Sequence, residues 1–420
     1  YFYGKYIHYM PIPIFNSVAS FFLKRRIGQI ELFKDYPIEV QQEVLRKLVV
    51  YSIDTEVGKK FDFKTIRHYN DFKERVPIVA YEDIYKDIER NRKGEQNIFW
   101  RTPVKWFAKS SGTTNAKSKF IPISFESLED CHYKAGKDML SLYFNNNINS
   151  QLLAGKCLRL GGSKDIYEDN SSYYGDLSAI IIDNLPFWAE LGSTPSSKVS
   201  LISEWEKKVQ AIINESINEN VTSFAGVPSW MLSLLQQVIQ QTGKENILEV
   251  WSNSEVYFHG GVNFDPYRNL YKKLFPSKDF KYFEIYNASE GFFGIQNDLN
   301  DESMLLMLDY GVFYEFIPME NIEETIPDFH NTPKRYARLM EVVNSDPKGR
   351  VADVERELDD QRADAFDLGL HVEEHAAHVG VFDDTHALFG RAAYFGRLDP
   401  ILRIGQSVHQ VYSFIILLGP

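Results

Sequence analysis

The pattern of apolar and polar positions between residues 150 and 290 alternates between two periods. Short apolar runs predict β-strands at 156–160, 179–182, 221–224, 255–258 and 282–286. Between them, apolar positions recur with helical spacing over 201–213, 230–241 and 266–274. This alternation predicts an α/β fold whose sheets are mainly parallel and flanked by helices. Such sheets bind ligands beyond the carboxyl ends of their strands, so we expect the chemistry at that edge.

The same patterns predict elements on either side of this region. Residues 12–34 mix apolar and basic positions and are expected to form a helix, and a clearer helix begins at Pro37. Proline is favoured in the first turn of a helix, because its missing N–H loses no hydrogen bond there. Further predictions are a break at Pro77, a helix N-cap at Ser229, and a hairpin of 304–308 with 312–316.

Composition changes sharply after Lys334. The chain up to that point is rich in Lys, Asn, Ile and Tyr, whereas beyond it Lys348 is the only lysine, against eight arginines. Such a shift marks a domain boundary, a foreign segment or an error in sequence assignment. We therefore predict a large nucleotide- and acyl-binding domain over 1–330, and a smaller C-terminal domain or anomalous segment over 331–420.

Charge and cysteine content narrow the class of protein. A net charge of −12 over 420 residues argues against a nucleic-acid surface. Cys131 and Cys157 form neither a disulfide framework nor a metal-ligand pattern, which predicts a reducing, cytoplasmic setting. No apolar run approaches the ~20 residues of a membrane span. The chain begins at Tyr1 rather than Met, so we expect a fragment of a longer protein.

The stretch 107–122 carries the most specific candidate chemistry. Four hydroxyl side chains surround Gly112, namely Ser110, Ser111, Thr113 and Thr114, and two lysines, Lys117 and Lys119, follow. Glycine lets a backbone approach a ligand, while hydroxyls and lysines supply hydrogen bonds and positive charge. This mixture suits a polyphosphate, although the spacing is not that of the common P-loop. The alternative interpretation is a solvated polar loop.

Two further strings lie at predicted strand ends. In 286–291, Tyr286 offers a ring that stacks on a purine, Ser289 a hydroxyl, and Glu290 a carboxylate of the kind Mg²⁺ prefers. The alternative is a glycine-terminated loop with one exposed glutamate. The second string is 259–262, where Gly260 and Gly261 precede Val262. A tight strand-to-helix turn would also favour these glycines.

In their order along the chain, the three strings resemble those of the auxin-responsive (Gretchen Hagen) family of acyl-acid amido synthetases, within the acyl-adenylate-forming superfamily. The resemblance covers roughly residues 20–325 and favours a bacterial-type homologue. Ala116 stands where many members have glycine.

The resemblance implies ATP and Mg²⁺ as cofactors, and a carboxylic acid and an amino acid or other amine as substrates. It implies catalytic roles for Lys117 and Glu290, with Glu290 also holding Mg²⁺. It implies that ATP is bound by Ser110, Ser111, Gly112, Thr113, Thr114, Lys119, Gly260, Gly261, Val262, Tyr286 and Ser289. Val227 and Trp230 would line the acyl pocket.

The resemblance fails after about residue 330. The family should show a string close to Tyr-Arg-x-Gly-Asp there, whose aspartate grips the ribose. The nearest string is 402–406, in which Arg403 matches but Gln406 replaces the aspartate. Either ribose binding is weakened or the match arises by chance. The string His371–His375 also fits a zinc-peptidase spacing, for which a solvated helix face is the alternative.

The predicted function is an ATP-dependent acyl-acid amido synthetase. It would adenylate a carboxylic acid and pass the acyl group to an amine, without nucleic acid or membrane as partners. One alternative is an acyl-CoA ligase that uses the same adenylation step. Others are a nucleotide-binding protein without turnover, and a protein whose hydroxyl-rich loop binds nothing.

Overall fold

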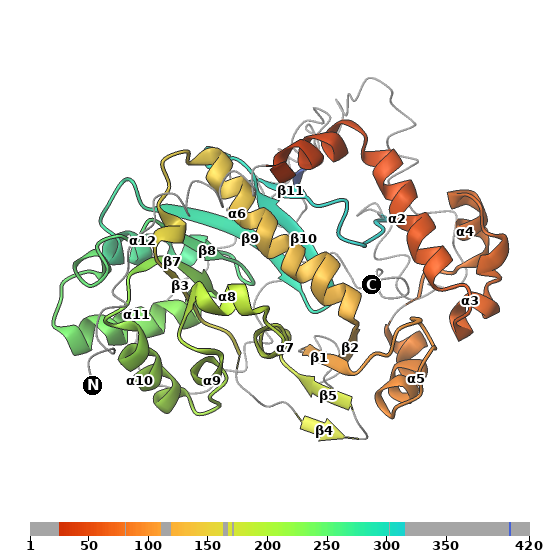
Figure 1. The fold of residues 1–420 in the computed structure, drawn as a ribbon, viewed down its shortest axis with the longest axis horizontal. Helices are drawn as coiled ribbons and strands as arrows, with labels where there is room; N and C mark the ends of the chain where they lie inside the picture. The colour runs from red at the N-terminus through yellow and green to blue at the C-terminus, as the bar shows by residue number, and fades with distance from the viewer. Residues whose placement is uncertain are drawn as a thin grey trace, which may run out of the picture.

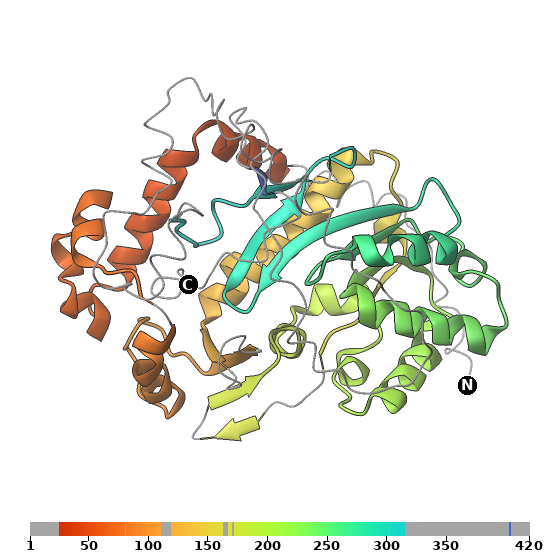
Figure 2. The same cartoon turned by 180° about the vertical axis from the view of Figure 1, so that it is seen from behind.

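The computed structural model describes residues 25–79, 81–110, 119–162, 167–169, 172–301, 303–315 and 403–404 (Figures 1 and 2). Residues 25–35 are helical, and the α-helices that follow are α2 Pro37–Tyr51, α3 Glu56–Lys60, α4 Tyr69–Arg75, α5 Tyr81–Arg92, α6 Lys134–Asn146, α7 Leu177–Asp183, α8 Phe187–Leu191, α9 Ser197–Ser200, α10 Trp205–Ser216, α11 Pro228–Thr242 and α12 Asp265–Leu274. Shorter helices are η1 Phe63–Thr65, the π-helix η2 Ser127–Tyr133, η3 Leu152–Ala154 and η4 Ile247–Glu249.

The larger of two sheets has the strand order β12-β11-β10-β9-β8-β7-β3-β6 in the described part of the chain. Its strands are β3 Lys156–Arg159, β6 Ser193–Thr194, β7 Val221–Gly226, β8 Val256–His259, β9 Lys281–Ala288, β10 Gly291–Gln296, β11 Met304–Leu306 and β12 Arg403–Ile404. From β6 to β9 every neighbouring pair is parallel, whereas β9 to β12 pair antiparallel. The parallel half confirms the α/β prediction.

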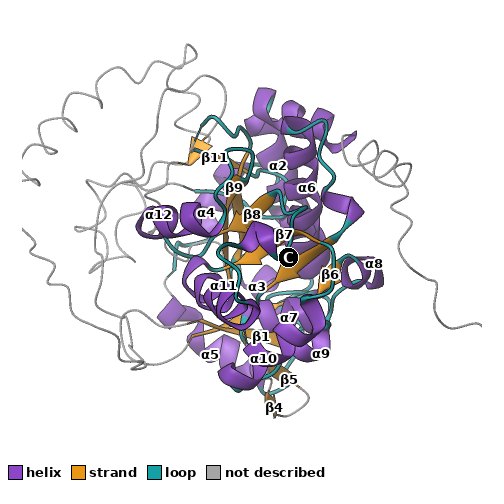
Figure 3. Cartoon of the chain, turned by 90° about the vertical axis from the view of Figure 1, so that its left-hand side faces the viewer, coloured by secondary structure: helices purple, strands orange, loops and turns teal. Residues whose placement is uncertain are grey.

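Helices cover both faces of this sheet (Figure 3). Alternate residues of a strand point to opposite faces. On one face, Tyr143 of α6 packs edge-on against Phe258 of β8, with ring centroids 5.5 Å apart. On the other, Tyr271 of α12 stacks on Tyr257 of β8 at 5.0 Å. The two faces of β8 therefore belong to two separate hydrophobic clusters.

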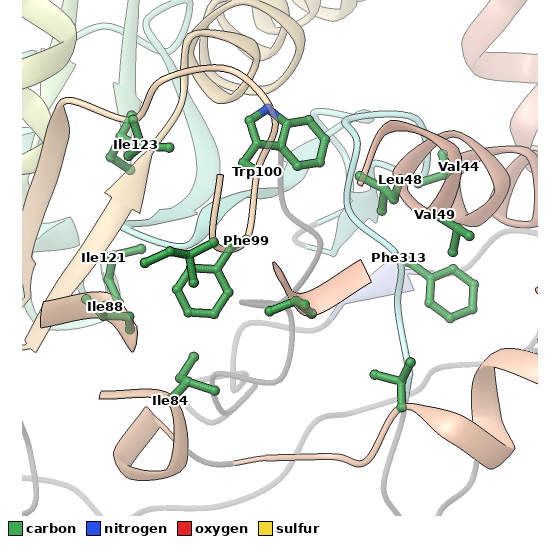
Figure 4. Packing of buried hydrophobic residues seen from close by; sticks show 14 of the residues in the cluster. Val44, Leu48, Val49, Ile84, Ile88, Phe99, Trp100, Ile121, Ile123 and Phe313 are labelled. Carbon is green, nitrogen blue, oxygen red and sulfur yellow. The ribbon is translucent and has the colours of Figure 1, made fainter. Parts of the chain in front are cut away.

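The smaller sheet has the order β2-β1-β5-β4, with β1 Trp106–Ser110, β2 Lys119–Ile123, β4 Tyr167–Asp169 and β5 Ser172–Gly175. β1 is parallel to β5 and antiparallel to β2. A third cluster packs this sheet against the N-terminal helices. Figure 4 shows the part of it in which Ile84 and Ile88 of α5 lie with Ile121 of β2. The helical N-terminal region thus supports β2, the strand that begins at Lys119.

Three local predictions are wrong. Residues 179–182 lie in the helix α7, because a short apolar run does not distinguish a buried strand from a buried helix. Helix α11 begins at Pro228 after Val227 as N-cap, so Ser229 lies inside its first turn. No hairpin pairs 304–308 with 312–316 within the described residues, because β11 pairs with β10 and β12 instead.

Other predictions are confirmed. The helix after Pro37 is α2, Pro77 follows the end of α4, and the predicted strands at 156–160, 221–224, 255–258 and 282–286 are β3, β7, β8 and β9. Residues 12–24 of the first predicted helix, the string His371–His375, Gln406 and most of the predicted domain 331–420 lie outside the described residues. None of the helices in the described part of the chain has the length and apolar character that a membrane span needs.

The π-helix η2 carries a buried histidine with a testable consequence. His132 is 5% exposed, and neither ring nitrogen has a hydrogen-bond partner. Burial lowers its pKa from 6.5 to about 4, since the charged imidazolium would lose its hydration. The unfolded chain therefore binds a proton that the folded chain does not bind until the pH falls to about 4.

We expect His132 to destabilise the fold as the pH falls below the unfolded pKa. Between about pH 7 and about pH 5, its share of the loss in unfolding free energy should be about 2 kcal/mol. Denaturant titrations at both pH values should show that His132→Gln loses less stability than the wild type by about that amount. Equal losses for the two proteins would contradict the neutral state of His132.

A candidate nucleotide site at the carboxyl edge of the large sheet

The carboxyl ends of three neighbouring parallel strands bring separate motifs to one edge of the large sheet. Gly226 at the end of β7 pairs with His259 at the end of β8, and His259 pairs with Glu284 of β9. The residues that follow these pairing points are Val227, 260–262 and 285–290. The fold thus places two of the three predicted motifs side by side, although they are more than twenty residues apart in sequence.

The glycine pair lets the turn after β8 lie against β9. A Cβ atom on Gly260 would stand 2.3 Å from the backbone oxygen of Ile285, closer than any side chain tolerates. Gly261 has φ +86°, a backbone conformation that residues other than glycine rarely adopt. A Cβ atom there would lie 3.4 Å from Cγ2 of Val227. Gly261 is exposed and Val262 half-buried. The predicted adenine-binding turn and the predicted acyl-pocket residue Val227 therefore adjoin.

Replacing Gly260 tests this close approach. We expect Gly260→Ala to lower the unfolding free energy by about 1–3 kcal/mol, because the backbone of β9 must shift to admit the methyl group. The matched control is Gly136→Ala in α6, where nothing lies within 4 Å of the added Cβ. This control variant should have an unfolding free energy equal to or higher than that of the wild type, since alanine has a higher helix propensity than glycine. Equal effects in denaturant titrations would contradict the packing of the turn.

His259, the last residue of β8, directly precedes the glycine pair and has a buried, uncharged side chain. It is 3% exposed, and its ring stacks on Phe264 with centroids 4.0 Å apart. Burial lowers its pKa to about 3, and the positive charge of Arg268 acts in the same direction. The side chain is therefore uncharged at neutral pH and contributes packing rather than charge.

The end of β9 holds Tyr286, and the turn between β9 and β10 holds Ser289 and Glu290. All three are half-buried, and the ring of Tyr286 lies 5.3 Å from that of Phe293. Burial raises the pKa of Glu290, while a hydrogen bond from its own backbone N–H and, to a smaller extent, the positive charge of Lys119 oppose the shift. A cation placed beside such a buried carboxyl group would stabilise its charged form. Glu290 is thus electrostatically coupled to the first residue of β2.

Lys119 belongs to the other sheet, yet it lies near this turn. Its Cα pairs with that of Ser110, so the loop between them leaves and re-enters the small sheet at one point. In the view of Figure 1 the β9–β10 turn points toward β1 and β2, and the charge of Lys119 acts on Glu290. Residues 111–118 lie outside the described part, and with them Ser111, Gly112, Thr113, Thr114 and Lys117, as does the side chain of Ser110.

Of the two remaining predicted site residues, Trp230 lies in the first turn of α11, three residues after Val227, whereas Arg403 lies farther from the β9–β10 turn. Trp230 is 55% exposed and packs edge-on against Trp205, with centroids 5.0 Å apart. Arg403 is in β12 opposite Leu305, and Leu305 pairs with Ile295 near the far end of β10. That position is about 13 Å along β10 from Gly291, where the β9–β10 turn ends. The structure does not bring Arg403 to the turn that carries Glu290.

Sequence reasoning missed two features next to the site. Lys208 of α10 is 3% exposed, and its ammonium donates to the carbonyls of Gly161 at 2.7 Å and Gly162 at 3.0 Å, just beyond β3. Burial lowers its pKa to about 8, and the negative charge of Asp176 opposes the shift. Tyr81 and Glu82 contact Lys119. Neither feature forms a motif, because each pairs residues more than thirty positions apart.

Metal binding at this edge would rely on few protein ligands. Among the described residues, no group of three His, Cys, Asp or Glu side chains could hold a metal ion. A half-buried carboxylate whose charge burial disfavours nonetheless suits Mg²⁺, which takes one or two carboxylates together with phosphate oxygens. Glu290 therefore fits a metal that arrives with its nucleotide.

Solved structures share this arrangement of sheets and helices. The chain is similar to "AtGH3.15 acyl acid amido synthetase in complex with 2,4-DB", with a TM-score of 0.58, 17% identity, and coverage of 68% of this chain and 59% of that chain. A second structure, "GH3.15 acyl acid amido synthetase", gives a TM-score of 0.58 at 16% identity over 70% of this chain and 62% of that chain. The fold is therefore that of the acyl acid amido synthetases.

A family model described as the "GH3 family N-terminal domain" matches residues 26–280, more than half of the chain. The chain belongs to the GH3 family, and this confirms the resemblance to the Gretchen Hagen family that its three motifs indicate.

Among curated relatives from Arabidopsis thaliana, "Indole-3-acetic acid-amido synthetase GH3.2" is 34% identical over 101 residues, which is 24% of this chain and 18% of that protein. "Indole-3-acetic acid-amido synthetase GH3.4" is 35% identical over 94 residues, 22% of this chain and 16% of that protein. The matched segments span less than a fifth of these relatives.

Proposed function

We propose that the protein is an ATP-dependent acyl-acid amido synthetase. A carboxylate oxygen of the acid attacks the α-phosphorus of ATP, and pyrophosphate leaves with the electron pair of the broken P–O bond. The amine of an amino acid then attacks the acyl carbon, AMP leaves, and the nitrogen loses a proton. The products are an amide, AMP and pyrophosphate. Family membership supports this proposal, and the grouping of motifs at the sheet edge supports it independently.

The residues of this chain would act by positioning and by charge. The adenine would lie between Tyr286 and the backbone of Gly260 and Gly261, whose missing side chains leave room for a flat base. Lys119 would face the phosphates, where developing negative charge needs a fixed positive partner. Val227 beside Gly261 would contact the acyl group. Holding acid and nucleotide in line is the main catalytic contribution expected of such a site.

Glu290 would hold Mg²⁺, which when bound offsets the charge of the phosphates. We further propose roles for the hydroxyls of the loop after β1 in phosphate binding, for Lys117 beside them, and for Ser289 at a phosphate or the ribose. A bacterial-type homologue, a cytoplasmic setting, and the absence of nucleic-acid and membrane partners remain predictions.

One observation carries the proposal, namely that the parallel strands β7, β8 and β9 bring Val227, the glycine pair and the turn with Glu290 to one edge of the large sheet. Lys119 belongs to the other sheet and to a motif about 170 positions before Glu290 in sequence, and its positive charge acts on that carboxylate. A nucleotide with its metal would use the glycine pair beside the base, Lys119 beside the phosphates and Glu290 beside the metal.

The test is ATP–pyrophosphate exchange with a panel of carboxylic acids. We expect exchange that depends on one acid or a few, followed by amide formation when amino acids are added. Formation of a thioester with coenzyme A, and not of an amide, would favour an acyl-CoA ligase. Nucleotide binding without exchange for any acid would contradict the synthetase activity and favour a protein without turnover.

A further inference from the structure

The ammonium of Lys119 is held by the first turn of α5, a helix outside the predicted motifs. Its Nζ lies 3.4 Å from Oε1 of Glu82 and 5.0 Å from the centroid of the Tyr81 ring. We propose that Tyr81 is a positioning residue for Lys119, and that Glu82 is a resting counter-ion which the polyphosphate of the nucleotide displaces. This inference rests on the proposed function.

Tyr81 fixes the backbone of β2 as well as its first side chain. Its hydroxyl accepts a hydrogen bond from the backbone N–H of Phe120 at 2.9 Å. β2 is the edge strand of the small sheet, so this donor faces away from its neighbour β1 and a side chain must satisfy it. Arg92 at the end of α5 lies over the Phe120 ring at 4.8 Å. The start of β2 is thereby fixed to both ends of one helix.

The ring of Tyr81 and the carboxylate of Glu82 make different contributions. The Lys119 side chain is 22% exposed, and the ring face of Tyr81 limits where its ammonium lies. The Glu82 side chain is 58% exposed, so its ion pair is screened by solvent and easily exchanged. A polyphosphate carries several charges, and it therefore competes effectively for the same ammonium.

The charge of Lys119 also acts on Glu290, where it opposes the rise in pKa that burial causes. The lysine therefore influences two carboxylates, one in α5 at 3.4 Å and one in the β9–β10 turn. In the nucleotide-free protein Glu82 takes the ammonium. With nucleotide bound, the ammonium turns from Glu82 to the phosphates, and the Tyr81 ring remains its support.

This exchange predicts opposite signs for two neighbouring substitutions. Glu82→Gln removes the competitor, so the Kd of Mg-ATP by calorimetry and the KM for ATP in pyrophosphate exchange should fall by about two- to fivefold. Tyr81→Leu removes the ring, so both should rise by about three- to tenfold with kcat less affected. Tyr81→Phe keeps the ring and loses the hydrogen bond from the Phe120 N–H, so its Kd should rise clearly less than that of Tyr81→Leu.

Two controls separate this effect from folding. Glu74→Gln in α4 and Tyr85→Phe in α5 change exposed side chains of the same type and should leave the Kd unchanged. The Kd values of Tyr81→Leu and Tyr81→Phe are compared at a temperature at which both variants are fully folded. A Kd that rises equally for Tyr81→Phe and Tyr81→Leu would overturn the role of the ring, as would a rise for Glu82→Gln.

Lys119→Met distinguishes failure of this inference from failure of the proposed function. This variant should weaken Mg-ATP binding, and in its background Glu82→Gln should have no further effect. If Lys119→Met binds Mg-ATP as the wild type does, the nucleotide site itself is wrong. If Lys119→Met weakens binding while the Tyr81 and Glu82 variants change nothing, only the positioning inference fails.

Discussion

Glu290→Gln should lower ATP–pyrophosphate exchange by about 10²-fold or more while leaving the fold intact. The substitution keeps the size of the side chain and removes the negative charge that would hold Mg²⁺ against the phosphates. Burial raises the pKa of Glu290, so the charged form is disfavoured in the folded state. Neutralising it should therefore leave the unfolding free energy unchanged or raise it.

Such a combination of lost activity and retained stability identifies a carboxylate that serves a ligand rather than the fold. The rate of ATP–pyrophosphate exchange and the midpoint of denaturant unfolding are both measured on the same preparation of each variant. The matched control is Asp279→Asn, an exposed carboxylate between α12 and β9, which should change neither quantity. An exchange rate within about threefold of the wild-type rate would show that Glu290 has no role in the adenylation step.

Asp138→Ala should produce the largest loss of stability, about 3–5 kcal/mol. Asp138 of α6 is 1% exposed and accepts hydrogen bonds at 3.0 Å from Nε of Arg26 and at 2.9 Å from the hydroxyl of Tyr310. Arg26 also pairs with Asp309, whose other carboxylate oxygen lies 3.0 Å from Lys134. The network ties the helix at 25–35, α6 and the segment after β11 together.

Removing the carboxylate leaves the charge of Arg26 and the hydroxyl of Tyr310 partly unpaired in a buried setting, which is why the cost exceeds that of a surface pair. Denaturant unfolding at neutral pH measures this loss. Glu43→Ala provides the control, because Glu43 pairs with Arg46 on the exposed face of α2 and should cost less than about 0.5 kcal/mol. Equal losses for the two variants would contradict the buried network.

The sequence predicted the parallel half of the large sheet because its strands are short, apolar and separated by clear helical stripes. It failed at 179–182, where burial on several sides gives a helix the composition of a strand. It also failed at 304–316, because the apolar pattern does not show which strands pair, whether the partner is the preceding strand β10 or the distant β12. β11 pairs with β10 and β12, and no local pattern shows either partner.

The candidate site was predictable where chemistry is local and unpredictable where it is assembled. Gly260, Gly261, Tyr286 and Glu290 lie at strand ends, and their residue types indicate a nucleotide. The partners of Lys119 come from α5, and Lys208 reaches the carbonyls beyond β3 from α10. These contacts depend on helix packing, which the apolar pattern predicts only as a stripe and not as a register.

Hydrogen exchange with and without Mg-ATP tests the central claim most directly, namely that three distant segments surround one nucleotide. Peptides that contain 110–119, 260–262 and 286–290 should all gain protection at the same nucleotide concentration, and the Lys119→Met variant should shift all three together. Protection confined to one of these segments, or found on a different part of the chain, would contradict the account.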